Sequence, residues 1–139
     1  IDAVKRDFLM ASFPDNGVLF RNVEHLQKGA LFNYRTKTMA TVPRARLVTC
    51  GFPCTDVSAM STEASTSAHR HIVADGSLRT GSAFHGICSY LDSEAGQHVE
   101  LLCLENVIGL AAPPSDGGPS NLTSCLDKLS KLEIQWSSS

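Results

Sequence analysis

The sequence predicts an α/β fold with a mostly parallel sheet and flanking helices. Short runs of continuous apolar residues, bounded by turn residues, alternate with longer stretches that repeat an apolar residue every three or four positions. Continuous apolar runs are typical of strands in parallel sheets, and strands that alternate with helices build such sheets. The length of 139 residues is enough for one domain with a hydrophobic core.

The first part of the chain contains one expected helix and one expected strand. Residues 1–10 place Val4, Phe8 and Leu9 on one side of a helix, and Val18-Leu19-Phe20 has the composition of a short strand. We expect the strand to belong to the sheet.

The remainder of the chain continues the alternation. We expect strands at residues 47–50 and 99–104, helices at residues 78–91 and 122–132, and a last strand at residues 134–136. A parallel sheet of this kind should be covered by helices on both faces.

Two loops follow strands and are therefore placed to carry function. Residues 56–77 are rich in Ser, Thr and Ala, and residues 112–120 are rich in Pro and Gly. Ligands of open parallel sheets bind beyond the carboxyl ends of the strands.

Composition narrows the class of protein. Apolar residues make up 42 % and charged residues 19 % of the chain, which is typical of a soluble globular protein. A formal net charge of −2 argues against a self-sufficient nucleic-acid clamp. No apolar run approaches the roughly 18 residues of a membrane span, so we expect no membrane partner.

Five cysteines, an odd number, favour a reduced protein in an intracellular compartment. Two of them, Cys50 and Cys103, lie within apolar runs, where a thiol is ordinarily part of the core. The first residue is Ile1 and no signal peptide follows, so we expect the chain to begin inside a longer protein.

The segment Gly51-Phe52-Pro53-Cys54-Thr55-Asp56-Val57-Ser58 presents one thiol at the tip of a strand. Gly and Pro favour a sharp exit from the sheet, and a nucleophilic cysteine needs such a rigid and partly exposed position near backbone N–H groups. A cysteine in a turn without chemical function is the alternative.

A second strand, Leu101-Leu102-Cys103-Leu104, ends in Glu105 and Asn106. A carboxyl group at this edge can share or donate a proton to a bound ring nitrogen. A solvated glutamate at a strand end is the alternative, but a thiol and a carboxyl group at two strand ends of one parallel sheet favour an active site.

Three segments in this order resemble motifs of the cytosine C5 methyltransferases. They are the Pro-Cys segment at residues 51–58, Arg79-Thr80-Gly81-Ser82-Ala83-Phe84, which is similar to a short helix-start segment, and Leu104-Glu105-Asn106-Val107-Ile108-Gly109-Leu110, which is similar to the Glu-Asn-Val motif. The resemblance implies a partial Rossmann-like S-adenosylmethionine-dependent methyltransferase fold. Residues 1–139 would form an incomplete catalytic domain without the N-terminal cofactor loop and the C-terminal target-recognition part, and we expect the isolated chain to be inactive.

The resemblance also implies roles for individual residues. Cys54 would be the nucleophile and Glu105 the base-binding catalytic carboxyl group; the remaining substrate-binding residues would be Phe52, Pro53, Asn106 and Val107. Asn22 and Val23 would contact the cofactor, S-adenosylmethionine. The chain departs from the family in two places, because Thr55 stands where Gln is usual and Asn22 where Asp is common.

The implied reaction is methyl transfer to C5 of a flipped cytosine in DNA through a covalent adduct between the cysteine and C6. The implied compartment is intracellular, and nuclear in a eukaryote, and no metal is expected. Three alternatives stay open: a relative that acts on transfer RNA, a non-catalytic descendant that serves in interactions, and a zinc site that combines Cys50 and Cys54 with His69 and His71.

Overall fold

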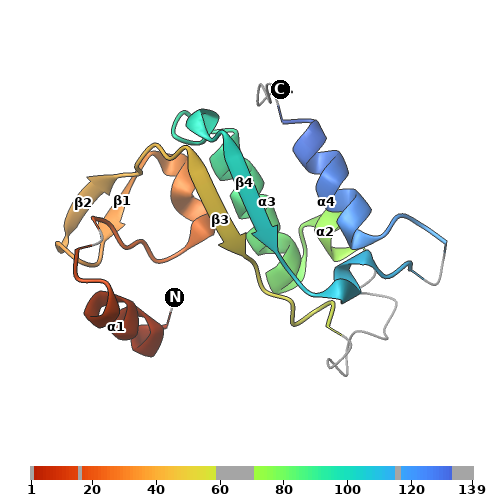
Figure 1. Cartoon of the computed structure of the whole chain (residues 1–139), viewed down its shortest axis with the longest axis horizontal. Helices are drawn as coiled ribbons and strands as arrows, with labels where there is room; N and C mark the ends of the chain where they lie inside the picture. Colours follow the sequence, from red (N-terminus) through yellow and green to blue (C-terminus); the bar gives the residue numbers. More distant parts are fainter. Residues whose placement is uncertain (1, 16, 59–70, 115–116, 133–139) are drawn as a thin grey trace.

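The computed structural model describes residues 2–15, 17–58, 71–114 and 117–132. Four α-helices, four strands and three short 3-10 helices follow one another along these residues (Figure 1). In chain order they are α1 (Ala3–Ser12), η1 (Val23–Lys28), β1 (Ala30–Asn33), β2 (Thr38–Thr41), β3 (Leu47–Gly51), α2 (Ile72–Asp75), α3 (Leu78–Leu91), η3 (Gly96–His98), β4 (Leu101–Glu105), η4 (Ile108–Ala111) and α4 (Asn121–Ser130).

A parallel pair of strands, β3 and β4, lies at the centre of the fold, with α2 and α3 in the connection between them. The pairing runs from Leu47 opposite Leu101 to Gly51 opposite Glu105. Parallel pairing requires a crossover of this kind, because the chain must return to the same end of the sheet. The molecule is thus α/β with a small parallel sheet and flanking helices.

The start of the parallel pair is fixed by backbone and side-chain contacts. The carbonyl of Arg46 accepts hydrogen bonds from the N–H groups of Glu100 and Leu101 at 2.8 and 3.0 Å. The guanidinium group of Arg46 donates to both carboxylate oxygens of Glu100 at 2.7 and 2.6 Å. A bidentate contact of this type also fixes the relative orientation of the two side chains. The register of β3 and β4 is therefore set by the residues that directly precede the strands.

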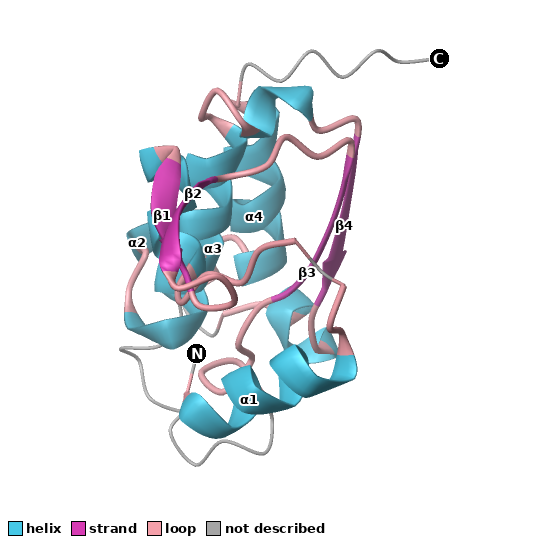
Figure 2. Ribbon diagram, turned by 90° about the vertical axis from the view of Figure 1, so that its left-hand side faces the viewer, coloured by secondary structure: helices cyan, strands magenta, loops and turns pink. Residues whose placement is uncertain are grey.

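The hydrophobic core lies on one face of the sheet, around α3. Phe84, Ile72, Leu91 and Val73 are fully buried, and Figure 2 shows α2, α3 and α4 on the same side of β3 and β4. On the opposite face Leu47 and Leu101 are 58 % and 60 % exposed. The expectation that both faces are covered is therefore wrong for the residues that the structure describes.

Glycine allows η1 to pack closely against α3. A Cβ atom on Gly86 would lie 2.8 Å from the Cα atom of Glu24, closer than two such atoms can approach. The hydroxyl of Ser82, one turn earlier in α3, donates a hydrogen bond to the Glu24 carboxylate. Backbone contact and a polar link together hold the N-terminal part of the chain against α3.

The N-terminal part contains an antiparallel hairpin, β1–β2, and the expected strand at Val18-Leu19-Phe20 is wrong. This segment lies beside the end of β1, where Asn33 accepts from the N–H of Leu19 at 3.0 Å and the N–H of Tyr34 donates to the Leu19 carbonyl at 2.9 Å. The segment is held mainly by one buried amide side chain, so no ladder forms.

Several expected elements are confirmed. The helix at residues 78–91 has the expected bounds, and the strands and helices near residues 47–50, 99–104 and 122–132 form with ends shifted by one or two residues. The first helix forms at Ala3–Ser12 but buries none of its residues. The expected strand at residues 134–136 lies outside the described residues. None of the described helices is long and apolar enough to cross a membrane.

Candidate active site at the carboxyl ends of β3 and β4

The carboxyl ends of β3 and β4 bring the two predicted catalytic segments to one edge of the sheet. Gly51, the last residue of β3, is the register partner of Glu105, the last residue of β4. The Oε2 atom of Glu105 lies 3.0 Å from the point where a Cβ atom of residue 51 would be. The carboxylate therefore lies beside the Gly51 backbone, three residues before Cys54.

Asn106 connects the two segments directly. Its Nδ2 atom donates a hydrogen bond to the Phe52 carbonyl at 3.0 Å, and its Oδ1 atom accepts from the N–H of Val107 at 2.9 Å. The side chain thus fixes the exit of β3 and the exit of β4 at the same time. For this residue, predicted to bind substrate, the structure gives a bridging role.

The Phe52 side chain anchors the start of the cysteine segment. Phe52 is 7 % exposed, and its ring centroid lies 5.5 Å from that of Phe84 in α3. Pro53 is exposed and Cys54 is half-buried. A buried ring followed by an exposed proline marks the exit of β3, and Cys54 itself packs partly buried against the core.

Cys54 begins a tight turn. Its carbonyl accepts hydrogen bonds from the N–H groups of Val57 at 3.1 Å and Ser58 at 2.9 Å. Val57 is buried, and its carbonyl oxygen lies 2.2 Å from the position of a Cβ atom on Gly109, so only glycine fits there. The turn after the cysteine is therefore packed against the segment that follows Glu105.

The connection of this turn to α3 was not predicted from the sequence. The Asp56 carboxylate accepts hydrogen bonds from both the N–H and the hydroxyl of Thr80, each at 2.8 Å. The resemblance of residues 79–84 to a helix-start segment of the cytosine C5 methyltransferases drew attention to the start of α3. Nothing in the sequence pattern indicated that Thr80 would bind Asp56.

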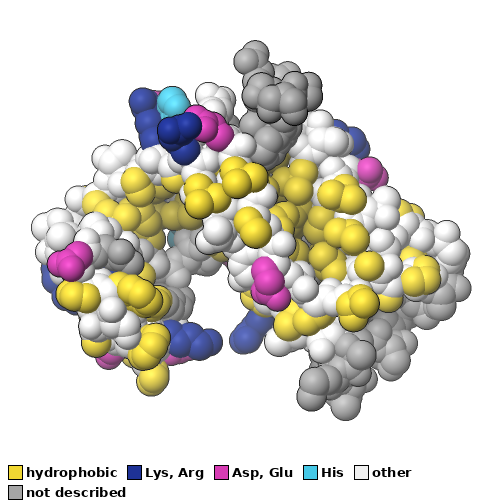
Figure 3. Space-filling model, in the orientation of Figure 1, with side chains coloured by type: hydrophobic (Ala, Val, Ile, Leu, Met, Phe, Trp, Pro, Cys, Tyr) yellow, Lys and Arg dark blue, Asp and Glu magenta, His cyan; other side chains and the backbone are white. Residues whose placement is uncertain are grey.

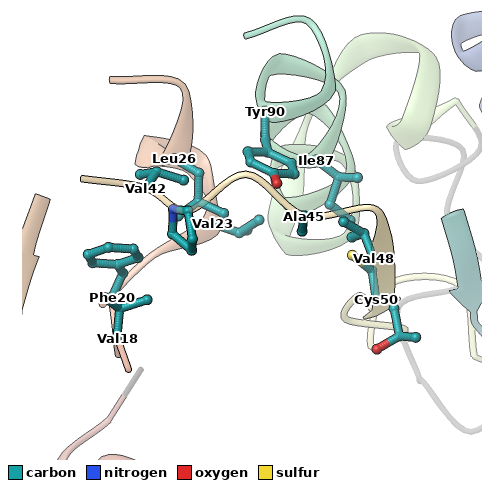
Figure 4. A pocket seen from close by; sticks show the side chains of 12 residues that line it. Val18, Phe20, Val23, Leu26, Val42, Ala45, Val48, Cys50, Ile87 and Tyr90 are labelled. Atoms are coloured by element: carbon teal, nitrogen blue, oxygen red, sulfur yellow. The ribbon is translucent and has the colours of Figure 1, made fainter. Parts of the chain in front are cut away.

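Asn22 and Val23, the predicted cofactor residues, lie in a different part of the molecule. Asn22 caps η1, where its side-chain oxygen accepts from the N–H of Glu24 at 3.1 Å. Val23 lines an apolar pocket of about 270 Å³ between η1, α3 and β3, together with Phe20, Cys50 and Tyr90 (Figure 4). The side chains that line this pocket are mostly apolar, and none of them is acidic.

A second cavity of about 370 Å³ lies between β4, η4 and α4. Asn106 and Val107 line it with the apolar side chains of Leu104, Leu126 and Leu129. Figure 3 shows apolar side chains gathered on this side of the molecule, to the right of β4. Val107 therefore contributes to a largely apolar wall behind the sheet edge.

The zinc alternative depends partly on residues outside the described part of the chain. His69 is one of these, and no group of three potential ligands gathers among the residues that the structure describes. Cys50 is half-buried on the helix-covered face, and burial, with the nearby Cys103, raises the pKa of its thiol. Burial also raises the pKa of Cys88 to about 11 and that of Cys125 to about 12.

No family model matches the chain, and no curated protein or solved structure matches it either.

Proposed function

We propose that this chain belongs to the catalytic domain of a cytosine C5 methyltransferase that acts on DNA. The observation that carries the proposal is the shared sheet edge: the Cys54 and Glu105 segments leave neighbouring parallel strands, and the bond from Asn106 to the Phe52 carbonyl joins them. Two strand ends joined in this way can hold a thiol and a carboxyl group over one planar base.

In the proposed reaction the Cys54 thiolate adds to C6 of the cytosine and forms a carbon–sulfur bond. Glu105 binds N3 and the exocyclic amine and stabilises the charge that develops on the ring. When bound, S-adenosylmethionine would supply the methyl group that C5 accepts, and S-adenosylhomocysteine would be the leaving group. Loss of the C5 proton and cleavage of the carbon–sulfur bond then release the methylated base and the free cysteine.

The backbone at Phe52 and Pro53 has a supporting role in this proposal. The Phe52 carbonyl already accepts from Asn106, and a carbonyl oxygen has a second lone pair that can accept from the exocyclic amine of a base. Asn106 would then orient the backbone of the base-binding edge. Val23 lines the apolar pocket on the other side of β3, which would receive the adenine part of S-adenosylmethionine, and Asn22 precedes Val23 as the N-cap of η1.

The chain has a net charge of −2, so the grip on the DNA backbone must come mainly from other segments of the full protein. Extrusion of the base from the duplex costs a few kcal/mol. The proposal is therefore tested on the full protein and not on residues 1–139 alone.

The decisive experiment traps the covalent adduct. The full protein is incubated with S-adenosylmethionine and duplex DNA whose cytosines carry fluorine at C5, which cannot leave as a proton does. We expect an adduct stable to denaturing electrophoresis, its loss with Cys54→Ala, and its retention with Cys103→Ala, a matched change at an exposed cysteine of the same sheet. Glu105→Gln should slow adduct formation by about 100-fold or more.

A parallel incubation with fluorinated transfer RNA tests the alternative substrate. An adduct with RNA and none with DNA would overturn the DNA assignment and keep the chemistry. A folded full protein that forms an adduct with neither would overturn the proposed function.

A further inference from the structure

The contact between Asp56 and Thr80 crosses from the cysteine turn to the first turn of α3. Thr80 is fully buried, and both its N–H and its hydroxyl donate to the same carboxylate oxygen of Asp56. Hydrogen bonds to an ionised acceptor are roughly twice as strong as neutral ones. The contact is therefore a strong tie between two segments that are separated by 24 residues.

Asp56 supplies a cap that α3 lacks within its own sequence. Ser77 stands at the N-cap but its side chain makes no capping hydrogen bond. The first N–H groups of a helix need acceptors from outside the helix, and a negative charge is favourable there. Asp56 is therefore bound to the first turn of α3 as well as being part of its own closed turn.

The same tie constrains the cysteine. Cys54 and Asp56 belong to one turn, which the Cys54 carbonyl closes by accepting from Val57 and Ser58. On one side of the cysteine, the Phe52 carbonyl is bound by Asn106. On the other side, the Val57 carbonyl is packed against Gly109. Asp56 completes this support from a third element, α3.

We propose that Asp56, held by Thr80, is a positioning residue that fixes the direction of the Cys54 thiol. It need not touch the substrate, because it acts through the turn that it shares with the cysteine. The inference rests on the proposed function for its consequence in catalysis. Its effect on the thiol can be measured without methyl transfer.

The test measures how fast iodoacetamide labels Cys54, by peptide mass spectrometry, with exposed Cys103 as the internal reference in every sample. Thr80→Val keeps the backbone N–H and removes the hydroxyl; Thr80→Ser keeps both donors. Asp56→Asn keeps the size of the side chain and removes its charge. Glu94→Gln, at an exposed carboxylate that pairs with Arg44 instead, is the matched control.

We expect labelling of Cys54, relative to Cys103, to rise about fivefold in Thr80→Val, the factor by which loss of one ordinary hydrogen bond shifts a local opening equilibrium. Asp56→Asn should give an increase of the same order, whereas Thr80→Ser and Glu94→Gln should label like the parent. Thermal unfolding of each variant shows that it is folded. If Thr80→Val does not fold, the milder Asp56→Asn decides the outcome.

The full protein provides the second measurement. Thr80→Val should lower kcat by about tenfold or more with little change in KM for DNA, and Thr80→Ser should restore kcat. Parental labelling in folded Thr80→Val and Asp56→Asn would overturn the positioning role, whatever the enzyme assay shows. Increased labelling without any trapped adduct in the parent would instead overturn the proposed function and leave the structural tie intact.

Discussion

Gly51 leaves room for the carboxylate of Glu105 at the end of β3. A side chain at residue 51 would meet the Oε2 atom at 3.0 Å, which is tighter than most real contacts of a Cβ atom. The carboxylate is the far end of a flexible side chain, so it can move away at little cost to the fold. A side chain at residue 51 would therefore change the position of the Glu105 carboxylate with little effect on the stability of the fold.

If Glu105 binds the base as proposed, Gly51→Ala should lower the rate of methyl transfer by the full protein by about tenfold or more, because a small displacement of such a group is costly to catalysis. The melting temperature should be unchanged or raised, since Ala reduces the entropy of the unfolded chain by about 0.4–1 kcal/mol where the backbone permits it. Gly17→Ala is the control, because no atom lies within 4 Å of its added Cβ. Parental kcat in Gly51→Ala would contradict this role.

The buried cysteines offer a test of the core that needs no activity. Burial raises the pKa of Cys88 to about 11 and of Cys125 to about 12, so both remain protonated at pH 8. Iodoacetamide at pH 8 should therefore label exposed Cys103 well before either of them, with rates measured by peptide mass spectrometry. Equal rates for Cys103 and Cys125 in the folded chain would contradict the burial of Cys125.

Among the elements, the sequence predicted the longer helices and the two parallel strands, whereas the short α2 and the hairpin were not predicted. The bounds of the helix at residues 78–91 were predicted correctly, because Phe84, Ile87 and Leu91 repeat at helical spacing and are all buried. The β1–β2 hairpin was not predicted, because its strands have four residues each and its turn lacks glycine although Lys37 has a φ of 61°. Elements that are held by local polar contacts do not produce a repeat of apolar residues, so the sequence pattern does not predict them.

The ion pair before β3 and β4 gives an element-scale prediction. Hydrogen bonds from Arg46 lower the pKa of Glu100 below its ordinary value of 4.5. A lowered pKa means that the ion pair stabilises the fold at pH values above the pKa of Glu100 in the unfolded chain. This stabilisation is lost as the pH falls through the pKa of Glu100 in the folded chain. Glu100→Gln should therefore lower the melting temperature slightly at pH 7, and the difference should shrink as the pH is lowered toward 2.

Thermal unfolding at both pH values checks this expectation. The effect should be small because the two side chains are 80 % and 61 % exposed, and 1 M salt should reduce it further. A pH-independent difference between Glu100→Gln and the parent would show that the charge is not its origin.

At the scale of the whole molecule, the core depends on α3 and on one face of the sheet. Phe84→Ala should destabilise the chain by about 3–5 kcal/mol, because the ring is fully buried and contacts Phe52. Phe8→Ala, at a residue that is 65 % exposed, should change the free energy of unfolding by no more than about 0.5 kcal/mol. Denaturant unfolding monitored by circular dichroism measures both.

The candidate site was predictable only in part, because some of its contacts depend on how distant segments pack together. Cys54 and Glu105 could be assigned to one sheet edge because parallel strands end at the same side. The contact of Asp56 with Thr80 could not, because it depends on where α3 begins relative to the turn. The uncovered sheet face was not predictable either, because the continuous apolar strands indicated burial on both sides.

The fixed register of β3 and β4 limits how the length of the chain can vary. Side chains of a strand alternate between the two faces, so one additional residue inside β4 would turn Glu105 toward the helices and separate Asn106 from Phe52. The segment before β4 is also fixed, because the hydroxyl of Ser93 donates to the Tyr90 carbonyl and accepts from the N–H of Gly96. A change of one residue in the length of β4 would therefore alter the strand end that holds Glu105 and Asn106.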